Sequence, residues 1–401
     1  MVPRDSRLSR RQFIRHAGLA VVSIGAAPSL LAACGDGTAA TTTAAGATTT
    51  MAGGTTAPAG SLGAVDYLSW EGYDLPIESM DAWRAANGVT SNPTYIANHD
   101  EIQAKLVAGG DTAGYDLITY YQGYKPLYTE LDILTPLDEE QLPNLAGLFE
   151  FWGSDIDNFW INADGTRTGV PFTWGSIGLT YDSAQVDEMS SWFDLLDPSL
   201  EGRISMPDDP AGLFNLTCKI LGLDPAAAPK AELDNVVDTL GMFVAHANSV
   251  SPSFGDMTTK LVAGDIVACF HGWAAMNTFA AGEGLDTVRT NIPEEGSHTF
   301  CDSYAIPPST DNPEAAHAWI NESLTPEANA EAAIYLVGGV TVEEAVPLLD
   351  ESTAQLYPYE DLDALLELAP LFSNAPSESD EFITFPEWTE RWQELKAGAA
   401  G

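Results

Sequence analysis

Short apolar runs along the chain alternate with segments whose apolar residues recur at helical spacing. The runs at residues 65–70, 94–96 and 115–119 predict strands, and the segments at 77–86 and 101–107 predict helices between them. The alternation resumes after residue 176, with strands predicted at 177–181, 203–206 and 266–271 and helices at 212–221, 233–245, 257–262, 313–320, 328–335 and 386–397. This order predicts an α/β fold of mostly parallel sheets flanked by helices, with ligands bound beyond the carboxyl ends of the strands.

The folded part of the chain is long enough for two lobes rather than one hydrophobic core. Residues 34–60, which precede it, are mainly Gly, Ala and Thr. Such a segment has too little apolar surface to offset the entropy lost on ordering, so it predicts a disordered tether.

The N-terminus carries the pattern of an export signal. Residues 9–15, Ser-Arg-Arg-Gln-Phe-Ile-Arg, resemble a twin-arginine signal, and an apolar run at 17–33 follows. The tetrad Leu31-Ala32-Ala33-Cys34 resembles the lipobox of bacterial lipoproteins. The run is short for a membrane span, so we expect residues 1–33 to be removed and Cys34 to carry a lipid. The protein would then be periplasmic or at the cell surface, tethered to a membrane.

The chain is strongly acidic, with 58 Asp and Glu against 16 Lys and Arg and a formal charge of −42. Removal of residues 1–33 would delete five arginines and one aspartate and so leave it more negative still. This charge excludes a nucleic-acid partner, disfavours an anionic ligand and would concentrate a cationic one near the protein. Acidity that serves solubility alone is an equally good explanation.

Enzyme and metal motifs are missing from the sequence. Cys218, Cys269 and Cys301 are an odd number with no close pair, and their apolar neighbours indicate inert buried thiols. The sequence contains no HExxH, GxSxG, Walker or GxGxxG spacing after the signal. We therefore expect no metal, no cofactor and no catalysis. A hydrolase remains an alternative through the acid pairs Asp208-Asp209 and Asp155-x-Asp157.

Aromatic and acidic side chains follow several predicted strands, where an α/β fold places its ligand. They are Trp70 and Tyr73, then Tyr120, Tyr121 and Tyr124, then Asp208 and Asp209, then His271 to Trp273, and finally Phe300 with Asp302. Aromatic faces attract cations, each contact contributing roughly 0.5 to 2 kcal/mol, and a carboxylate neutralises the charge at short range. The pattern therefore favours a desolvated cation as the ligand.

At these residues the chain resembles the spermidine/putrescine-binding proteins of ABC importers. The resemblance spans nearly all of residues 65–398 and rests on the order of six segments, namely 69–73 (Ser-Trp-Glu-Gly-Tyr), 115–117 (Tyr-Asp-Leu), 170–175 (Val-Pro-Phe-Thr-Trp-Gly), 202–209 (Gly-Arg-Ile-Ser-Met-Pro-Asp-Asp), 261–265 (Leu-Val-Ala-Gly-Asp) and 295–307. It implies a two-lobed periplasmic-binding-protein fold of type II, with a cleft that closes on a polyamine and an ABC permease as partner. We expect a monomer.

The resemblance also implies lobe boundaries and roles for individual residues. The first lobe would comprise 61–174 with 303–345, and the second 175–302 with 346–401. Trp70 and Tyr73 would be aromatic contacts of the first lobe, Trp273 that of the second, and Asp209 and Asp302 the carboxylates for two amines. Phe300 stands where a tryptophan is usual, and Tyr121 where a small hydroxyl residue is expected.

One departure bears on the ligand itself. Gly212 replaces a second acidic residue of the family pattern, so the ligand is expected to be shorter than a triamine or to carry fewer charges. A betaine-like or amino compound is the alternative within the binding class. Each residue also has a structural alternative: Trp70 could pack in the core, Tyr121 at the surface, and Asp209 could cap the helix that follows it.

Overall fold

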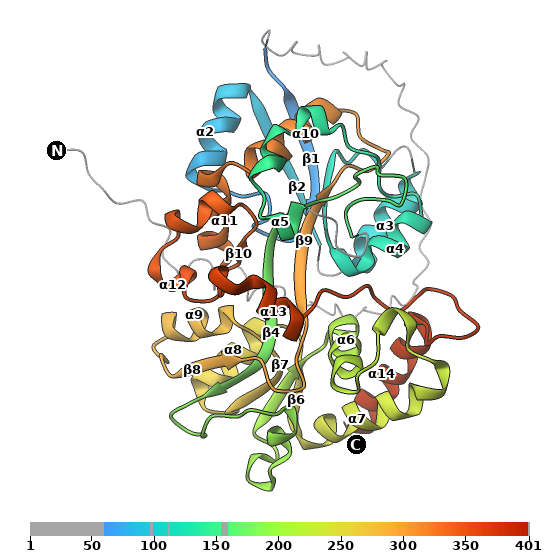
Figure 1. The fold of residues 1–401 in the computed structure, drawn as a ribbon, viewed down its shortest axis with the longest axis vertical. Helices are drawn as coiled ribbons and strands as arrows, with labels where there is room; N and C mark the ends of the chain where they lie inside the picture. Colours follow the sequence, from blue (N-terminus) through green and yellow to red (C-terminus); the bar gives the residue numbers. More distant parts are fainter. Residues whose placement is uncertain (1–59, 97–98, 111–112, 154–158, 400–401) are drawn as a thin grey trace, which may run out of the picture.

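The computed structural model describes residues 60–96, 99–110, 113–153 and 159–399, and the predicted signal and Cys34 lie outside this part. Two α/β halves are stacked along the long axis of the molecule (Figure 1). Among the described residues no helix is long and apolar enough to cross a bilayer.

The first half is built on three parallel strands in the order β2-β1-β3. Their bounds are β1 Gly63–Ser69, β2 Val89–Tyr95 and β3 Leu117–Tyr121. The helices of this half are α2 Glu78–Asn87, α3 His99–Gly109, α4 Lys125–Glu130, α5 Glu150–Gly153, α10 Pro313–Ser323 and α11 Pro326–Leu336. The short strand β10 Gly339–Val340 pairs with β4.

The second half repeats this plan with β6-β5-β7, again parallel. The strands are β5 Ile204–Pro207, β6 Ala247–Ser251, β7 Ala268–Trp273 and β8 Val288–Asn291. The helices are α6 Pro210–Ile220, α7 Leu233–His246, α8 Phe254–Ala263, α9 Ala275–Gly282 and α14 Phe385–Ala399. Each half has its own hydrophobic core, the first around Trp152, Trp174 and Trp319, the second around Trp192, Trp388 and Trp392.

Two long strands run between the halves, β4 Val170–Asp182 and β9 Thr299–Ala305 (Figure 1). They pair antiparallel, with Trp174 opposite Cys301 and Gly175 opposite Phe300. Every residue of β4 is buried. Because β9 also pairs with β3 and β4 with β7, the two strands join both sheets into one hydrogen-bonded unit.

The chain passes between the halves once more after α12 Glu351–Ala354 and α13 Leu362–Leu368, on its way to α14. Residues of α13 pack in the core of the first half. Further along the chain, the backbone N–H of Asn374 donates to the backbone carbonyl of Gly123 (3.0 Å). This bond fixes the segment to the 3-10 turn that follows β3.

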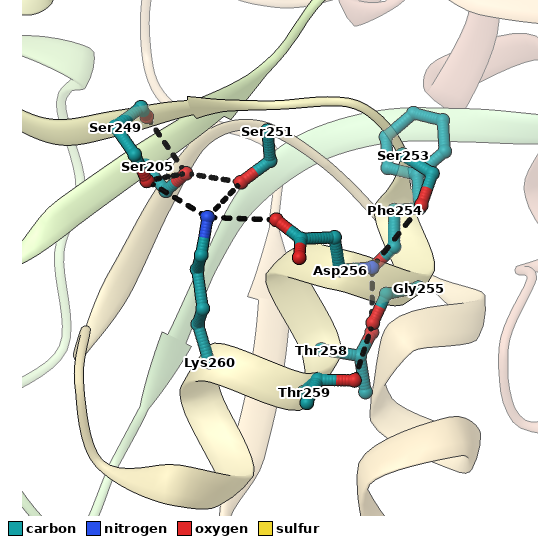
Figure 2. A network of polar contacts seen from close by, with 10 residues as sticks. All are labelled: Ser205, Ser249, Ser251, Ser253, Phe254, Gly255, Asp256, Thr258, Thr259 and Lys260. Atoms are coloured by element: carbon teal, nitrogen blue, oxygen red, sulfur yellow. Dashed lines mark hydrogen bonds and ion pairs between the residues drawn. The ribbon is translucent and has the colours of Figure 1, made fainter. Parts of the chain in front are cut away.

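A polar network holds α8 to the edge strand β6 and its neighbour β5 (Figure 2). The Lys260 ammonium donates to the hydroxyls of Ser249 and Ser251, both at 3.0 Å, and pairs with Asp256 at 2.7 Å. The buried Ser205 of β5 donates to the carbonyl of Ser249 and contacts the hydroxyl of Ser251 (2.8 Å). The network therefore fixes the start of α8, where Phe254 lies.

The predicted fold class is confirmed: the molecule is α/β and two-lobed. Each lobe combines its parallel strands with antiparallel pairing to β4 and β9. The helix predicted at 212–221 is α6, and the one at 233–245 is α7. The boundaries predicted for the two lobes stay a prediction.

Candidate functional site

The predicted ligand residues lie where strands end or cross. Trp70 follows β1, Tyr121 ends β3, Asp209 lies two residues after β5, and Trp273 ends β7. The remaining pair, Phe300 and Asp302, belong to the crossing strand β9. We call the group formed by these residues and Tyr73 the interlobe site.

Asp302 is the most enclosed carboxylate of the interlobe site. Its surface is 6% exposed, and the hydroxyl of Tyr73 donates to its Oδ2 at 2.6 Å. The Tyr73 ring packs edge-on against Phe172 (5.4 Å). Burial raises the pKa of Asp302 to about 6, although the Tyr73 hydrogen bond opposes the rise. A buried carboxylate with one hydroxyl donor retains capacity for a cation.

Trp70 contacts the rest of the interlobe site indirectly, because His99 lies between its ring and that of Tyr121. Its ring lies edge-on to His99 at 5.5 Å, and His99 in turn lies 6.4 Å from the ring of Tyr121. Burial lowers the pKa of His99 to about 3, so this imidazole is neutral at neutral pH. Trp70 also packs beside the hydrophobic cluster around Tyr120 and Tyr128, which is the core role that the sequence left open.

Tyr121 connects the two lobes. It pairs with Asp302 in the β3–β9 register, and its hydroxyl accepts from Nδ2 of Asn215 on α6 (3.2 Å). The same Asn215 nitrogen donates to Oδ1 of Asn374 (3.2 Å). Burial, followed by the negative charge of Asp209, raises the pKa of Tyr121, so its hydroxyl stays protonated. The position is therefore an interlobe contact.

Asp209 caps α6, as the sequence allowed. Its Oδ1 accepts from the amide of Gly212 at 3.1 Å, and its Oδ2 lies 4.0 Å from Nε2 of His271. The side chain is 43% exposed. Desolvation raises the pKa of Asp209, while the Gly212 amide lowers it. The second oxygen of Asp209 thus lies beside the buried His271 imidazole.

Gly212 is required by close packing. A Cβ at this position would overlap both the Asp209 carboxylate and the His271 imidazole. The second acid that the resemblance implies at this position would therefore have no room here.

A buried histidine pair beside Asp209 was missed from the sequence. Nε2 of His271 and Nε2 of His298 lie 3.0 Å apart, and both rings are almost fully buried. Burial lowers the pKa of each to about 3, so the pair is neutral. His271 is the last residue of the strand predicted at 266–271. Nothing in the sequence pattern indicates His298 as its partner.

Trp273 and Phe300, both predicted as ligand residues, lie beside each other. Their rings lie 5.7 Å apart in an edge-to-face arrangement, and a Cβ at Gly175 would overlap both. Phe254, which the sequence did not indicate, lies 5.8 Å from Trp273 and stacks on His271 at 6.1 Å. The α8 network described above places this ring.

The acids and thiols on which the alternative chemistries would depend have separate surroundings in the described part of the chain. Asp208 pairs with Lys396 (2.7 Å) and accepts a hydrogen bond from Trp392, whereas Asp209 caps α6, so the two acids have different partners. Asp155 and Asp157 lie outside the described residues. Cys218, Cys269 and Cys301 are free and buried, and burial raises the pKa of all three thiols. Within the described ranges, no three acids, histidines or cysteines group as metal ligands.

Two lobes joined by crossing strands, with a buried carboxylate and aromatic rings between them, define a solute-binding protein. The chain belongs to the family of bacterial extracellular solute-binding proteins, whose pattern matches residues 78–357.

Individual relatives agree with this assignment. The chain is 24% identical over 340 residues to spermidine/putrescine-binding periplasmic protein 1 of Haemophilus influenzae, covering 82% of this chain and 88% of the relative. It is 23% identical over 351 residues to the putrescine-binding periplasmic protein SpuD of Pseudomonas aeruginosa, covering 82% and 91%. The solved Tp0655 (TpPotD) lipoprotein of Treponema pallidum matches with a TM-score of 0.70 at 19% identity, over 83% of this chain and 99% of that one.

Proposed function

We propose that this protein is the extracytoplasmic receptor of an ABC importer and that it binds a small cation of the polyamine type. The observation that carries the proposal is Asp302, buried beside Tyr73 on a strand that crosses between the lobes. The names of the relatives in Haemophilus and Pseudomonas support the ligand class. The acidic charge of −42 would concentrate cations near the site.

The side chains at the interlobe site can supply a useful affinity. A micromolar dissociation constant corresponds to about −8 kcal/mol. An ammonium paired with Asp302 and placed against Tyr73, Trp273 or Phe300 would gain charge pairing and cation–π attraction of roughly 0.5 to 2 kcal/mol for each ring. Part of this gain offsets the ordering of ligand and side chains.

Closure would be a hinge motion of the two lobes about β4 and β9, near Trp174-Gly175 and Asp302-Ser303. The pairing of these strands supports this hinge, since β9 pairs with β3 of the first half and β4 pairs with both β9 and β7 of the second. The lobes would comprise 61–174 with 303–345 and 175–302 with 346–401. The closed form would present one continuous surface to the permease, and the receptor would perform no chemistry of its own.

The N-terminal pattern supports a membrane anchor. After twin-arginine export and cleavage, Cys34 would carry a diacylglyceryl group, and residues 34–60 would let the domain reach the permease. Mass spectrometry of the membrane-extracted protein should find a lipid-modified N-terminal Cys34, and Cys34→Ser should release the protein from membranes. An intact Met1 start would contradict this anchor.

A thermal-shift screen tests the ligand class. The purified full chain is exposed to diamines, triamines, amino alcohols, betaines, sugars and amino acids, and a ligand that binds only the folded state raises the melting temperature. Amines should produce the largest shifts and be recovered unchanged. A shift with sugars or anions alone would contradict the proposal.

A further inference from the structure

The two carboxylates of the interlobe site have different surroundings. Asp302 lies among aromatic rings, whereas Asp209 lies beside uncharged polar groups. The charge of Asp209 is already partly balanced, because its Oδ1 accepts the Gly212 amide at the N-terminus of α6, where a helix favours an anion. A second ammonium is therefore not required at this end.

Two buried amides at this end have unused hydrogen-bonding capacity. Asn215 is fully buried and Asn374 is 9% exposed. Asn215 Nδ2 serves both Tyr121 and Asn374, and in the described part of the chain neither Asn215 Oδ1 nor Asn374 Nδ2 has a partner. If the oxygen and nitrogen of both side-chain amides are exchanged, Asn374 becomes the donor to Asn215. One donor and one acceptor again remain without a partner. The pair thus offers one of each.

The histidine pair, His271 and His298, likewise has one hydrogen-bond donor and one acceptor without a partner among the described residues. One proton lies between the two Nε2 atoms, so one ring has Nδ1–H and the other a free Nδ1 lone pair. Both Nδ1 atoms are buried, and among the described residues neither has a partner. The half of the site around Asp209 is consequently rich in neutral donors and acceptors and contains no second free carboxylate among these contacts.

We propose that the solute is a monocationic amine whose other end carries an uncharged group that both donates and accepts a hydrogen bond, such as a hydroxyl or a carboxamide. This inference rests on the proposed function, namely a receptor for a small amine, and it replaces the second ammonium of a diamine by an uncharged group. An ammonium only donates hydrogen bonds, so a second ammonium would place a donor against the N–H2 donor of Asn374. A hydroxyl can accept from Asn374 and donate to Asn215. A site built for a hydroxyl strongly disfavours an analogue without it.

Calorimetry with three probes of equal length tests the inference: 4-aminobutan-1-ol, putrescine and pentylamine, each titrated into the full-length protein at neutral pH. The amino alcohol should bind at least about tenfold more tightly than the other two, since an unpaired buried polar group costs on this order. Asn374→Leu should reduce that preference to less than about threefold without weakening pentylamine. The control Asn235→Leu, an exposed amide on α7, should change nothing.

The outcomes separate the inference from the function on which it rests. Putrescine binding as tightly as the amino alcohol, or more tightly, overturns the inference alone, as does a preference that survives Asn374→Leu. Failure of all three amines to bind overturns the proposed function and the inference with it. The comparison of probes on the wild type needs no variant, so a misfolded Asn374→Leu protein leaves the test intact.

Discussion

Asp302 is the residue on which the proposed cation binding would depend most, because it is buried and accepts a hydrogen bond from the Tyr73 hydroxyl. Asp302→Asn preserves the shape of the side chain and removes its charge. We expect this variant to lose cation affinity by about 2 to 5 kcal/mol with little change in folding. Calorimetry measures the loss, and unchanged affinity would assign Asp302 to a structural role.

The raised pKa of Asp302 makes binding dependent on pH. In the proposed site only the ionised carboxylate would bind the cation, so affinity should fall as pH decreases through about 6 and then by about tenfold for each further pH unit. The folding stability of the ligand-free protein depends on pH in the opposite direction. Because the pKa of Asp302 is about 6 in the folded state and 3.8 in the unfolded state, its protonation adds stability below pH 3.8, and this added stability is lost as pH rises through about 6. The Asp302→Asn protein should lack this step in affinity, and a step that persists would implicate another group.

Gly212 offers a test of packing at the same scale. Gly212→Ala should destabilise the fold by about 1 to 3 kcal/mol, because the new methyl overlaps Asp209 and His271. The control Gly241→Ala lies inside α7, where the nearest atom to the new methyl is 3.4 Å away, and should be neutral or stabilising by up to about 1 kcal/mol. Urea denaturation compares the two. Equal stability of the two variants would contradict the crowding at Gly212.

Sequence reasoning indicated candidate residues within and after strands, but it indicated few of the polar residues that they contact in the fold. Tyr73 and Asp302 were both indicated, and they touch. Asn215, Asn374 and His298 were not, because a polar residue in a helix or a connecting segment has no local pattern that reveals a partner far along the chain.

At the scale of elements, the strongest apolar runs were predicted, whereas the short polar strands β6 and β8 were not. Strand β6, Ala-Asn-Ser-Val-Ser, and strand β8, Val-Arg-Thr-Asn, are short and half polar, since one side or end lies outside the core. Only the second part of β4 was predicted, because Pro171 and Gly175 interrupt its first part. The first part of β4 forms a strand because it pairs with β9, and not because of its local propensity.

The α8 network provides the prediction at this scale. Lys260→Met removes two bonds to serines and an ion pair that is only partly exposed, and should cost about 1 to 3 kcal/mol of folding free energy. Lys230→Met, which breaks a more exposed pair with Glu387, should cost less than about 1 kcal/mol. Denaturant titration of both variants decides, and an equal loss would mean that the network does not anchor α8.

For the whole molecule, the predicted two-lobed architecture and the family were both within reach of the sequence, because the order of motifs spans most of the chain. The sheet topology carries the functional consequence: two paired strands join lobes that otherwise have separate cores. Such a connection permits the lobes to rotate while each core stays packed. The net charge of −42 would favour the encounter with a cationic ligand and would also keep the protein soluble.

The most direct test of cation recognition is a calorimetric titration of the full chain with putrescine and with butane-1,4-diol, an uncharged probe of the same length. The account predicts saturable binding of the amine, with a dissociation constant in the micromolar range or about −8 kcal/mol, no detectable binding of the diol, and recovery of the amine unchanged. Binding of the diol as tightly as the amine, or consumption of the amine, would contradict it.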